Sequence, residues 1–369
     1  MLTRHLGAGP LSLARAQRAH TARILIETTD MALTDVAFAA GFSSVRQFNA
    51  TVREVYAATP TALRTSRSVA RRPEEAAGVV KVTLAVREPF DAAALLGFLA
   101  QRLIDGVEWA DNGTYARTLR LPRGHGQVAL TPTVAGQVEC VLRLTDLRDL
   151  SAAVERCRRL LDLDADPVAI DRHLATDALL HASVQAHPGM RVPGHVDGFE
   201  VAVRAVIGQQ ISVAGARTVA ARLVADHGEA VTDPEGLGLT QLFPTAAVLA
   251  AVDPTKLPMP RSRARALIEV AAAVAEGRIA LDRSADRAEV RAGLVALPGI
   301  GPWTADYIAL RALGDPDVFL ATDLGVRQGM AGMGYVGNDK QRAARADPWR
   351  PWRSYALMHV WRSVSNQTN

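Results

Sequence analysis

The sequence predicts a multidomain, mainly α-helical protein that contains one small antiparallel α/β domain. Three observations lead to this class: helical apolar spacing near the N-terminus, alternating strand patterns in the second quarter of the chain, and amphipathic helices punctuated by Pro and Gly after that. With 369 residues and 49% hydrophobic content, the chain has enough apolar material for two or three packed domains. We expect domains at residues 1–65, 79–163 and 164–369. A linker at residues 66–78 is expected to join the first domain to the second.

The charge distribution separates the N-terminal segment from the rest. The formal net charge is +4, and residues 1–72 hold ten arginines against four acidic residues, so everything after them sums to a slightly negative charge. The two cysteines, Cys140 and Cys157, exclude a disulfide scaffold or a four-cysteine metal site, and we expect both to be small buried residues. Without a long apolar run or a secretion signal, we expect a cytoplasmic protein with no membrane contact. We also expect a monomer without a cofactor.

The N-terminal segment has the pattern of a helix-turn-helix. Thr34 can cap a first short helix, Gly41 supplies a turn with positive φ, and Ser43 can cap a second helix. The second helix has a polar outer face of the kind that contacts bases and phosphates from a major groove. The alternative is a small helical hairpin whose polar face is simply solvated. The predicted DNA contacts are Ser43, Ser44, Arg46, Gln47, Asn49 and Arg53.

A closer likeness supports the first interpretation. The sequence AFAAGFSSVRQFN at residues 37–49, followed by YAATPTALR at 56–64, resembles the second helix-turn-helix of AraC-type regulators, as found in bacterial adaptive-response proteins. Residues 11–27 resemble the joining helix of that family, and residues 1–5 are at most a remnant of its first unit. The family's methyl-accepting cysteines and zinc cluster are missing from this sequence, so we do not expect methylation sensing by that route.

The middle segment predicts strands that two helices cover on one face. Alternation of apolar and polar residues predicts four strands, at residues 80–86, 115–121, 127–131 and 138–144. Amphipathic spacing predicts helices at about residues 91–102 and 147–161.

The strongest motif is LPGIGPWTADYIALR at residues 297–311. One helix ends before it, the Gly/Pro loop makes a tight hairpin, and Pro302 suits the first position of the next helix. Gly299, Gly301 and Thr304 lie where backbone amides at a helix start can hold a DNA phosphate without reading bases. The hairpin carbonyls could also hold a monovalent cation: those of Val295, Leu297 and Ile300.

An acidic residue follows the hairpin at a helix start. In DVFLATDLGVRQ at residues 317–328, Thr322 can cap a helix that Asp323 opens. A charged carboxylate there is stabilised by the helix, and it can stabilise an oxocarbenium-like sugar or orient water. The alternative is that Asp323 only assists capping.

Together these blocks resemble the helix-hairpin-helix DNA glycosylases, most closely the bacterial alkylation-inducible 3-methyladenine DNA glycosylases of type II. The likeness runs from about residue 80 to 361 and includes LGFLA at 96–100, YAR at 115–117, RAVIGQQISV at 204–213 and PWRSYALMHVW at 351–361. It implies a small antiparallel domain followed by an all-α helix-hairpin-helix domain. It also implies roles by position: Asp323 as catalytic carboxylate, Gln210 as the wedge that replaces the flipped base, and a substrate pocket of Phe98, Trp303, Tyr307 and Trp361.

The expected function is therefore excision of alkylated purines from double-stranded DNA during base-excision repair. Electron-rich rings suit a base that alkylation has made cationic, although hydrophobic core is the alternative for each ring. The hairpin lacks the Schiff-base lysine of bifunctional relatives, so we expect hydrolysis without strand cleavage. Gln210 stands where a close relative has leucine, and a polar turn residue is the alternative there. The competing function is a promoter-binding transcription regulator whose glycosylase-like part is an inactive clamp.

Overall fold

The computed structural model describes residues 31–56, 58–65, 79–133 and 136–365, with a few separate positions between residues 15 and 29. The predicted linker at 66–78 and most of the predicted joining helix at 11–27 lie outside the described residues. Contacts between Cα atoms divide the chain into two units, and the boundary passes through strands β1 and β3. The domain boundaries expected from the sequence stay predictions.

The first unit contains the N-terminal helices α3 (Leu33–Ala39), α4 (Val45–Tyr56) and α5 (Pro60–Thr65). Gly41 has φ +83° in the turn between α3 and α4, as predicted. Two predicted caps are wrong. Thr34 lies inside α3, because the helix begins at Leu33 with Ala32 as its N-cap, two residues earlier than the cap pattern suggests. Ser44 rather than Ser43 caps α4, since the Ser44 Oγ accepts a hydrogen bond from the Gln47 N–H at 3.2 Å.

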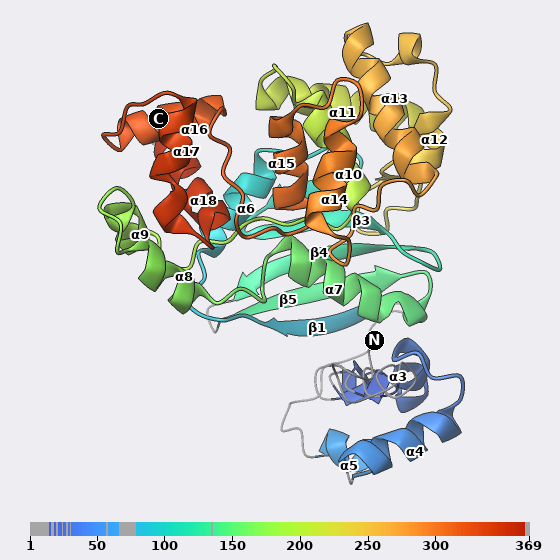
Figure 1. Cartoon of the computed structure of the whole chain (residues 1–369). Helices are drawn as coiled ribbons and strands as arrows, with labels where there is room; N and C mark the ends of the chain where they lie inside the picture. The colour runs from blue at the N-terminus through green and yellow to red at the C-terminus, as the bar shows by residue number, and fades with distance from the viewer. Residues whose placement is uncertain are drawn as a thin grey trace. The chain divides into compact units, whose positions relative to one another are not determined.

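The sheet has five strands in the order β1-β5-β4-β3-β2 (Figure 1). Their bounds are β1 Val79–Ala85, β2 Glu108–Asp111, β3 Thr114–Arg120, β4 His125–Thr133 and β5 Gln137–Leu144. β2 pairs with β3, and β4 pairs with β5, both antiparallel. The four predicted strands are confirmed, while β2 was missed because its four residues, Glu-Trp-Ala-Asp, are too few to show alternation. Cys140 on β5 and Cys157 are buried, as expected.

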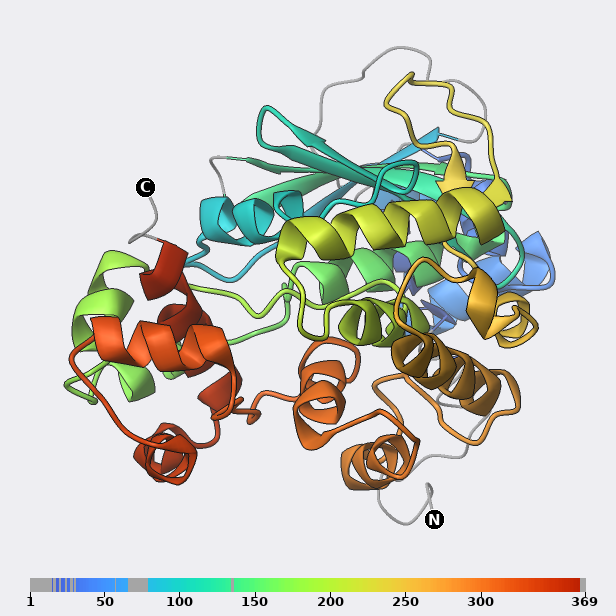
Figure 2. The same cartoon turned by 90° about the horizontal axis from the view of Figure 1, so that it is seen from above.

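The second unit is mainly helical. Figures 1 and 2 show two groups of helices, one around α10 and one around α16 and α18. The helices before α12 are α6 (Ala92–Ala100), α7 (Leu150–Leu160, shared with the first unit), α8 (Pro167–Leu174), α9 (His181–Ala186), α10 (Gly198–Ile207) and α11 (Val213–His227). The later ones are α12 (Ala246–Ala250), α13 (Arg261–Ala275), α14 (Arg287–Val295), α15 (Pro302–Arg311), α16 (Leu324–Gly332), α17 (Asp339–Arg345) and α18 (Arg353–Ser365).

Helix α10 forms the centre of the larger group. Eight of its residues are buried, and it packs against α13 and α15. Apolar residues cover most of the helix surface, and the remaining face carries Glu200 and Arg204, which pair with each other. The region after residue 164 is not purely helical as predicted, because Glu229–Ala230 and Gln241–Leu242 pair as two short strands.

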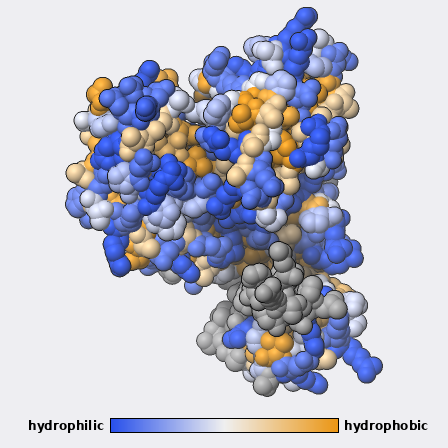
Figure 3. Space-filling view, in the orientation of Figure 1, coloured by the Kyte–Doolittle hydropathy of each residue, from blue (hydrophilic) through white to orange (hydrophobic). Residues whose placement is uncertain are grey.

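The surface mixes hydrophobic and hydrophilic side chains without one continuous apolar patch on the face in Figure 3. None of the helices in the described ranges is long and apolar enough to cross a membrane.

Candidate active site

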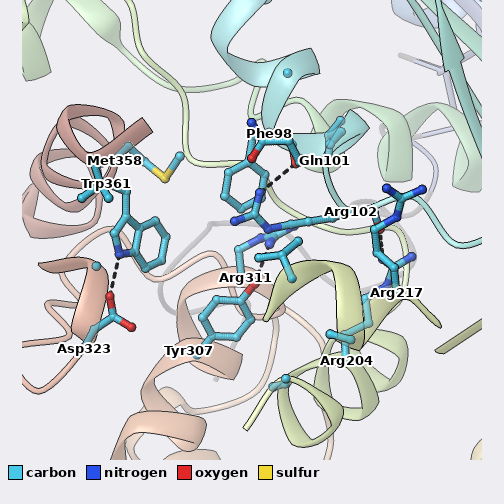
Figure 4. A pocket seen from close by; sticks show the side chains of 18 of the residues that line it. Phe98, Gln101, Arg102, Arg204, Arg217, Tyr307, Arg311, Asp323, Met358 and Trp361 are labelled. Carbon is cyan, nitrogen blue, oxygen red and sulfur yellow. Dashed lines mark hydrogen bonds between the residues drawn. The ribbon is translucent and has the colours of Figure 1, made fainter. Parts of the chain in front are cut away.

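A cavity of about 670 Å³ lies among the helices of the second unit. Its walls come from α6, the second half of α10, the turn to α11 and the first half of α11, one face of α15 along its length, the start of α16 and the end of α18. Figure 4 shows Phe98, Tyr307 and Trp361 around this space, with Asp323 beside Trp361. Trp303 also lines it, so the fold brings all four predicted pocket aromatics to one cavity with the predicted catalytic carboxylate.

The Asp323 carboxylate is oriented by three N–H donors. It is itself the N-cap of α16, and its Oδ1 accepts hydrogen bonds from the Val326 backbone N–H and from Nε1 of Trp361, both at 2.9 Å. Oδ2 accepts from Nε1 of Trp303 at 3.2 Å. Thr322, the predicted cap, is exposed and precedes the capping position. Capping requires only the bond from the Val326 N–H, so the two indole N–H groups are additional donors that fix the carboxylate. The N-terminus of α16 stabilises its negative charge.

Two glycines on α16 bring α18 close enough for the Trp361 contact. A Cβ placed on Gly329 would lie 2.1 Å from the Val360 carbonyl oxygen, so only glycine fits there. A Cβ on Gly325 would lie 3.0 Å from the Asp323 Oδ1 and 3.2 Å from Cδ1 of Trp361. These glycines recur four residues apart on one helix face. The sequence analysis did not single out these glycines, although two glycines four residues apart on a helix can indicate close packing of another helix.

The aromatic side chains do not form a purely neutral pocket. Trp303 and Tyr307 stack with ring centroids 5.4 Å apart. The guanidinium carbon of Arg102 lies 3.7 Å from the Phe98 ring centroid, and that of Arg311 lies 4.9 Å from it. Burial alone would raise the pKa of the Tyr307 phenol, but the guanidinium groups of Arg311 and Arg102 bring this pKa below its ordinary value. Protein cations therefore already face two of the rings.

The predicted hairpin joins α14 to α15. Gly299 has φ +83°, and a Cβ there would lie 2.7 Å from the Ala266 Cβ, whereas Gly301 faces open space. Pro302 opens α15 as expected. Thr304 is buried and its hydroxyl accepts a hydrogen bond from Gln209, so the phosphate contact predicted for it stays a prediction.

The carbonyls proposed for a monovalent cation belong to the same hairpin. The Leu297 carbonyl accepts a hydrogen bond from the Ile300 N–H at 3.1 Å within the turn. Val295 is exposed at the end of α14. The predicted cation role of these carbonyls stays a prediction.

The turn between α10 and α11 presents the predicted wedge residue. Gln210 is exposed and has φ +57°, which is uncommon for a residue with a side chain. Its neighbour Gln209 ties this turn to the hairpin, because its Nε2 donates to the Gly299 carbonyl at 3.1 Å and to the Thr304 Oγ1 at 3.0 Å. The turn that carries the predicted wedge residue is therefore hydrogen-bonded to the hairpin and to the start of α15.

On the helix-turn-helix segment, most of the predicted DNA contacts lie on the polar face of α4. Phe48 and Val52 are buried on its inner face, while Arg46 and Arg53 are exposed. Ser43 donates a hydrogen bond to the Gln47 side chain at 3.0 Å, so these two residues engage each other. The half-buried Asn49 and the exposed cap Ser44 complete the set.

Each of the three parts of the chain is similar to a known protein family. The sequence model of the AlkA N-terminal domain matches residues 81–197, that of the HhH-GPD superfamily of base excision DNA repair proteins matches 203–354, and that of a helix-turn-helix domain matches 1–66. The chain is 38% identical to DNA-3-methyladenine glycosylase 2 of Escherichia coli over 76% of this chain and 96% of that protein. This chain belongs to the AlkA family of DNA-3-methyladenine glycosylases.

A second relative carries the same parts in one chain. The "probable bifunctional transcriptional activator/DNA repair enzyme AlkA" of Mycobacterium tuberculosis is 49% identical, over 99% of this chain and 73% of that protein. Among solved structures, a 3-methyladenine DNA-glycosylase from Archaeoglobus fulgidus shares the fold with a TM-score of 0.67, at 21% identity, over 76% of this chain and 96% of that one. The predicted fold class is confirmed, as is the joining of a glycosylase to a helix-turn-helix.

A buried ion network next to the cavity was missed from the sequence. Arg204 donates to Glu108 at 2.5 Å and to Glu200 at 2.6 Å, and Arg117 contacts the same two carboxylates. Burial, followed by the nearby arginine charges, lowers the pKa of His195 well below its ordinary value, so this histidine is neutral. Glu108, His195 and Glu200 could geometrically meet a metal ion, but two guanidinium groups already neutralise the carboxylates. We assign them a structural role.

Proposed function

We propose that this protein is a monofunctional DNA glycosylase that hydrolyses the N-glycosidic bond of alkylated purines of the 3-methyladenine type. The observation that carries the proposal is the Asp323 carboxylate, held by two indole N–H groups at the edge of an aromatic cavity. A cavity of about 670 Å³ is large enough for a flipped purine.

In the proposed mechanism, the C1′–N bond breaks and its electron pair leaves with the base. The sugar becomes an oxocarbenium-like cation, which the Asp323 charge stabilises. Water then adds to C1′ and loses a proton. An alkylated purine is a good leaving group, so one carboxylate and a stacking pocket are sufficient.

We propose that the enzyme leaves an abasic site without cutting the strand. No lysine lines the cavity among the described residues, so no amine is available there to form a Schiff base with C1′. Borohydride added during the reaction should trap no covalent protein–DNA adduct. Formation of such an adduct would contradict this part of the proposal.

We further propose that Gln210 fills the space left by the flipped base, while the hairpin amides around Gly299 and Gly301 hold the DNA backbone. A comparison of two variants tests the wedge. Gln210→Leu keeps a bulky side chain, whereas Gln210→Gly removes it and also relieves the positive φ. We expect the Gly variant to lose activity on duplex DNA while the Leu variant retains most of it. Equal activity of the two variants would exclude a wedge role.

We propose that the helix-turn-helix segment adds a second DNA contact through the exposed face of α4, at the nucleoid. The name of the M. tuberculosis relative also suggests transcriptional activation. DNase footprinting on the gene's own promoter tests whether the segment binds DNA sequence-specifically. The presence of Asp323 in the cavity argues against a purely regulatory role for the whole chain.

The central experiment incubates the full chain with methylated DNA and identifies the released bases by chromatography. Release of free 3-methyladenine supports the proposal. DNA binding without release of any base would instead favour an inactive clamp.

A further inference from the structure

Arg342 is a buried arginine on helix α17, outside the cavity. Only 4% of its surface is exposed, and it is not among the residues that line the cavity. Figure 1 places α17 in the group of helices that contains α16 and α18. Because burying a charged side chain is costly unless its donors are paired, the hydrogen-bond partners of Arg342 indicate its role.

The Arg342 guanidinium donates hydrogen bonds to three acceptors. Two of them are local, since Nη1 donates to the Gly337 carbonyl and Nη2 to the Asp339 carboxylate, both near the start of α17. The third is distant in sequence, because Nε donates to the Ala321 carbonyl at 2.9 Å. Ala321 lies two residues before Asp323, so this bond joins α17 to the backbone that leads into the candidate active site.

The backbone that Arg342 holds has no regular secondary structure of its own. Residues 319–322 belong to no helix or strand, and the Asp323 N–H closes a turn by donating to the Leu320 carbonyl at 2.9 Å. Ala321 lies within this turn. Among the described residues, Arg342 provides the only side chain that hydrogen-bonds to this stretch of backbone. The bond therefore fixes the turn from which the Asp323 side chain projects.

The position of this turn matters because the carboxylate must meet groups on two other helices. Asp323 accepts from the indole N–H of Trp361 on α18 at 2.9 Å and from that of Trp303 on α15 at 3.2 Å. A displacement of about 1 Å at a reacting group can lower a rate by about 100-fold, even when its cause lies away from the chemistry. A turn without its bond to α17 would leave the carboxylate less precisely placed.

We propose that Arg342 is a positioning residue for base excision, which holds the turn at Ala321 so that the Asp323 carboxylate stays bonded to both indoles. The inference rests on the proposed glycosylase function and adds to it a residue outside the cavity. Arginine suits this role because its planar guanidinium donates in several fixed directions at once, whereas the ammonium of lysine is a single donor centre.

The first test measures single-turnover release of 3-methyladenine by the full chain, well below the melting transition of each variant. Arg342→Met keeps an unbranched side chain but no donor, and we expect its maximal rate to fall by about 10- to 100-fold. The protein concentration for half-maximal rate should change by less than about twofold, because Arg342 does not line the cavity. Arg342→Lys keeps one donor centre and should be at least about fivefold faster than Arg342→Met.

Arg345 provides a matched control on the same helix. It donates two hydrogen bonds to the Asp177 carboxylate, both at 2.6 Å, and none to residues 319–322. Arg345→Gln should lower the melting temperature but keep the maximal rate within about threefold. An equal loss of rate in Arg345→Gln and Arg342→Met would overturn the inference.

A double variant shows whether Arg342 acts through the carboxylate. In a chain that already carries Asp323→Asn, the further change Arg342→Met should lower the rate by less than about threefold, because the charge to be positioned is gone. A purely structural role would lower the rate by the same factor in both backgrounds, and that result would overturn the inference.

The indole N–H resonances of the full chain give a readout that needs no activity. The resonances of Trp303 and Trp361, assigned with Trp→Phe variants, should shift in Arg342→Met. They should stay in place in Arg345→Gln, where the resonance of Trp349 should shift instead, because its ring centroid lies 5.5 Å from the Arg345 guanidinium carbon. Unchanged Trp303 and Trp361 resonances in Arg342→Met would overturn the inference.

Two outcomes are kept apart from a failure of the positioning role. If the wild type releases no base, the proposed function fails, while the indole resonances still show whether Arg342 places the carboxylate. If Arg342→Met does not fold, Arg342→Lys is compared with Arg345→Gln. A smaller loss of maximal rate with shifted Trp303 and Trp361 resonances in Arg342→Lys alone supports the inference, and equal behaviour of these two variants contradicts it.

Discussion

Replacing Asp323 by Asn tests the proposed chemistry with a minimal change of shape. The substitution removes one negative charge and leaves a side chain of nearly the same size. A unit charge about 4 Å from the developing sugar cation is worth about 4 kcal/mol at an effective dielectric constant near 20. Because about 1.4 kcal/mol corresponds to a factor of ten in rate, we expect the excision rate to fall by roughly 1,000-fold.

The same substitution has a structural cost that the contacts define. Asp323 accepts three N–H donors, from Val326, Trp303 and Trp361. An amide oxygen can accept two of them, and the amide nitrogen then faces the third donor without an acceptor. Leaving one buried donor unsatisfied costs about 1–3 kcal/mol. The variant should therefore fold but melt at a lower temperature.

The assay is single-turnover release of 3-methyladenine at a temperature well below the melting transition of both proteins. Asp306→Asn is a suitable control, because Asp306 is a carboxylate on α15 that pairs with the half-exposed Arg291 and does not line the cavity. We expect this control to keep the wild-type rate within about twofold. If Asp323→Asn retained a rate within tenfold of wild type, the charge of Asp323 would not be what stabilises the transition state.

Three other predictions concern the wedge turn, the pH dependence of stability and the N-terminal segment. Gln209→Leu removes both hydrogen bonds to the hairpin and should weaken binding to abasic-site DNA by about tenfold in a fluorescence titration; unchanged affinity would show that turn and hairpin act separately. Burial raises the pKa of Asp162 from 3.8 to about 6. Its stabilising contribution is therefore fully present below about pH 4 and is lost as the pH rises through 6, a change of about 3 kcal/mol. Urea unfolding between pH 4 and 7.5 should show this slope, and Asp162→Asn should flatten it; equal slopes would contradict the assignment. In the full chain, replacing Arg46 and Arg53 by Ala should reduce the slope of log affinity against log salt by about 2, and an unchanged slope would exclude α4 from the DNA contact.

Features that depend on local sequence were predicted well. The Gly/Pro hairpin, the turn at Gly41 and the helix that follows Asp323 all arise from backbone preferences of residues close in the chain. The exact capping residue was less predictable. Ser43 and Ser44 are adjacent residues of the same type, so the sequence pattern alone could not decide between them.

Features that depend on tertiary contacts were not predictable in the same way. Arg117 and Glu200 are 83 residues apart, and charged residues are normally expected at the surface. Nothing in the periodicity of either segment indicates that they meet in a buried network. The signal lay in the matched blocks at residues 115–117 and 204–213, which supply both arginines of the network, Arg117 and Arg204.

The cavity shows why summed charge is a poor guide to a site. The chain after residue 72 is slightly acidic by formal charge, which predicts a catalytic part without a strong positive field. Yet the second unit places Arg102 and Arg311 on the Phe98 ring, with neutral groups as their hydrogen-bond acceptors. Glu108 and Asp323 line the same cavity but form no ion pair with either of these arginines among the described residues. The field that a flipped base would meet is therefore set mainly by the two nearest guanidinium groups and Asp323, not by the summed charge of the chain.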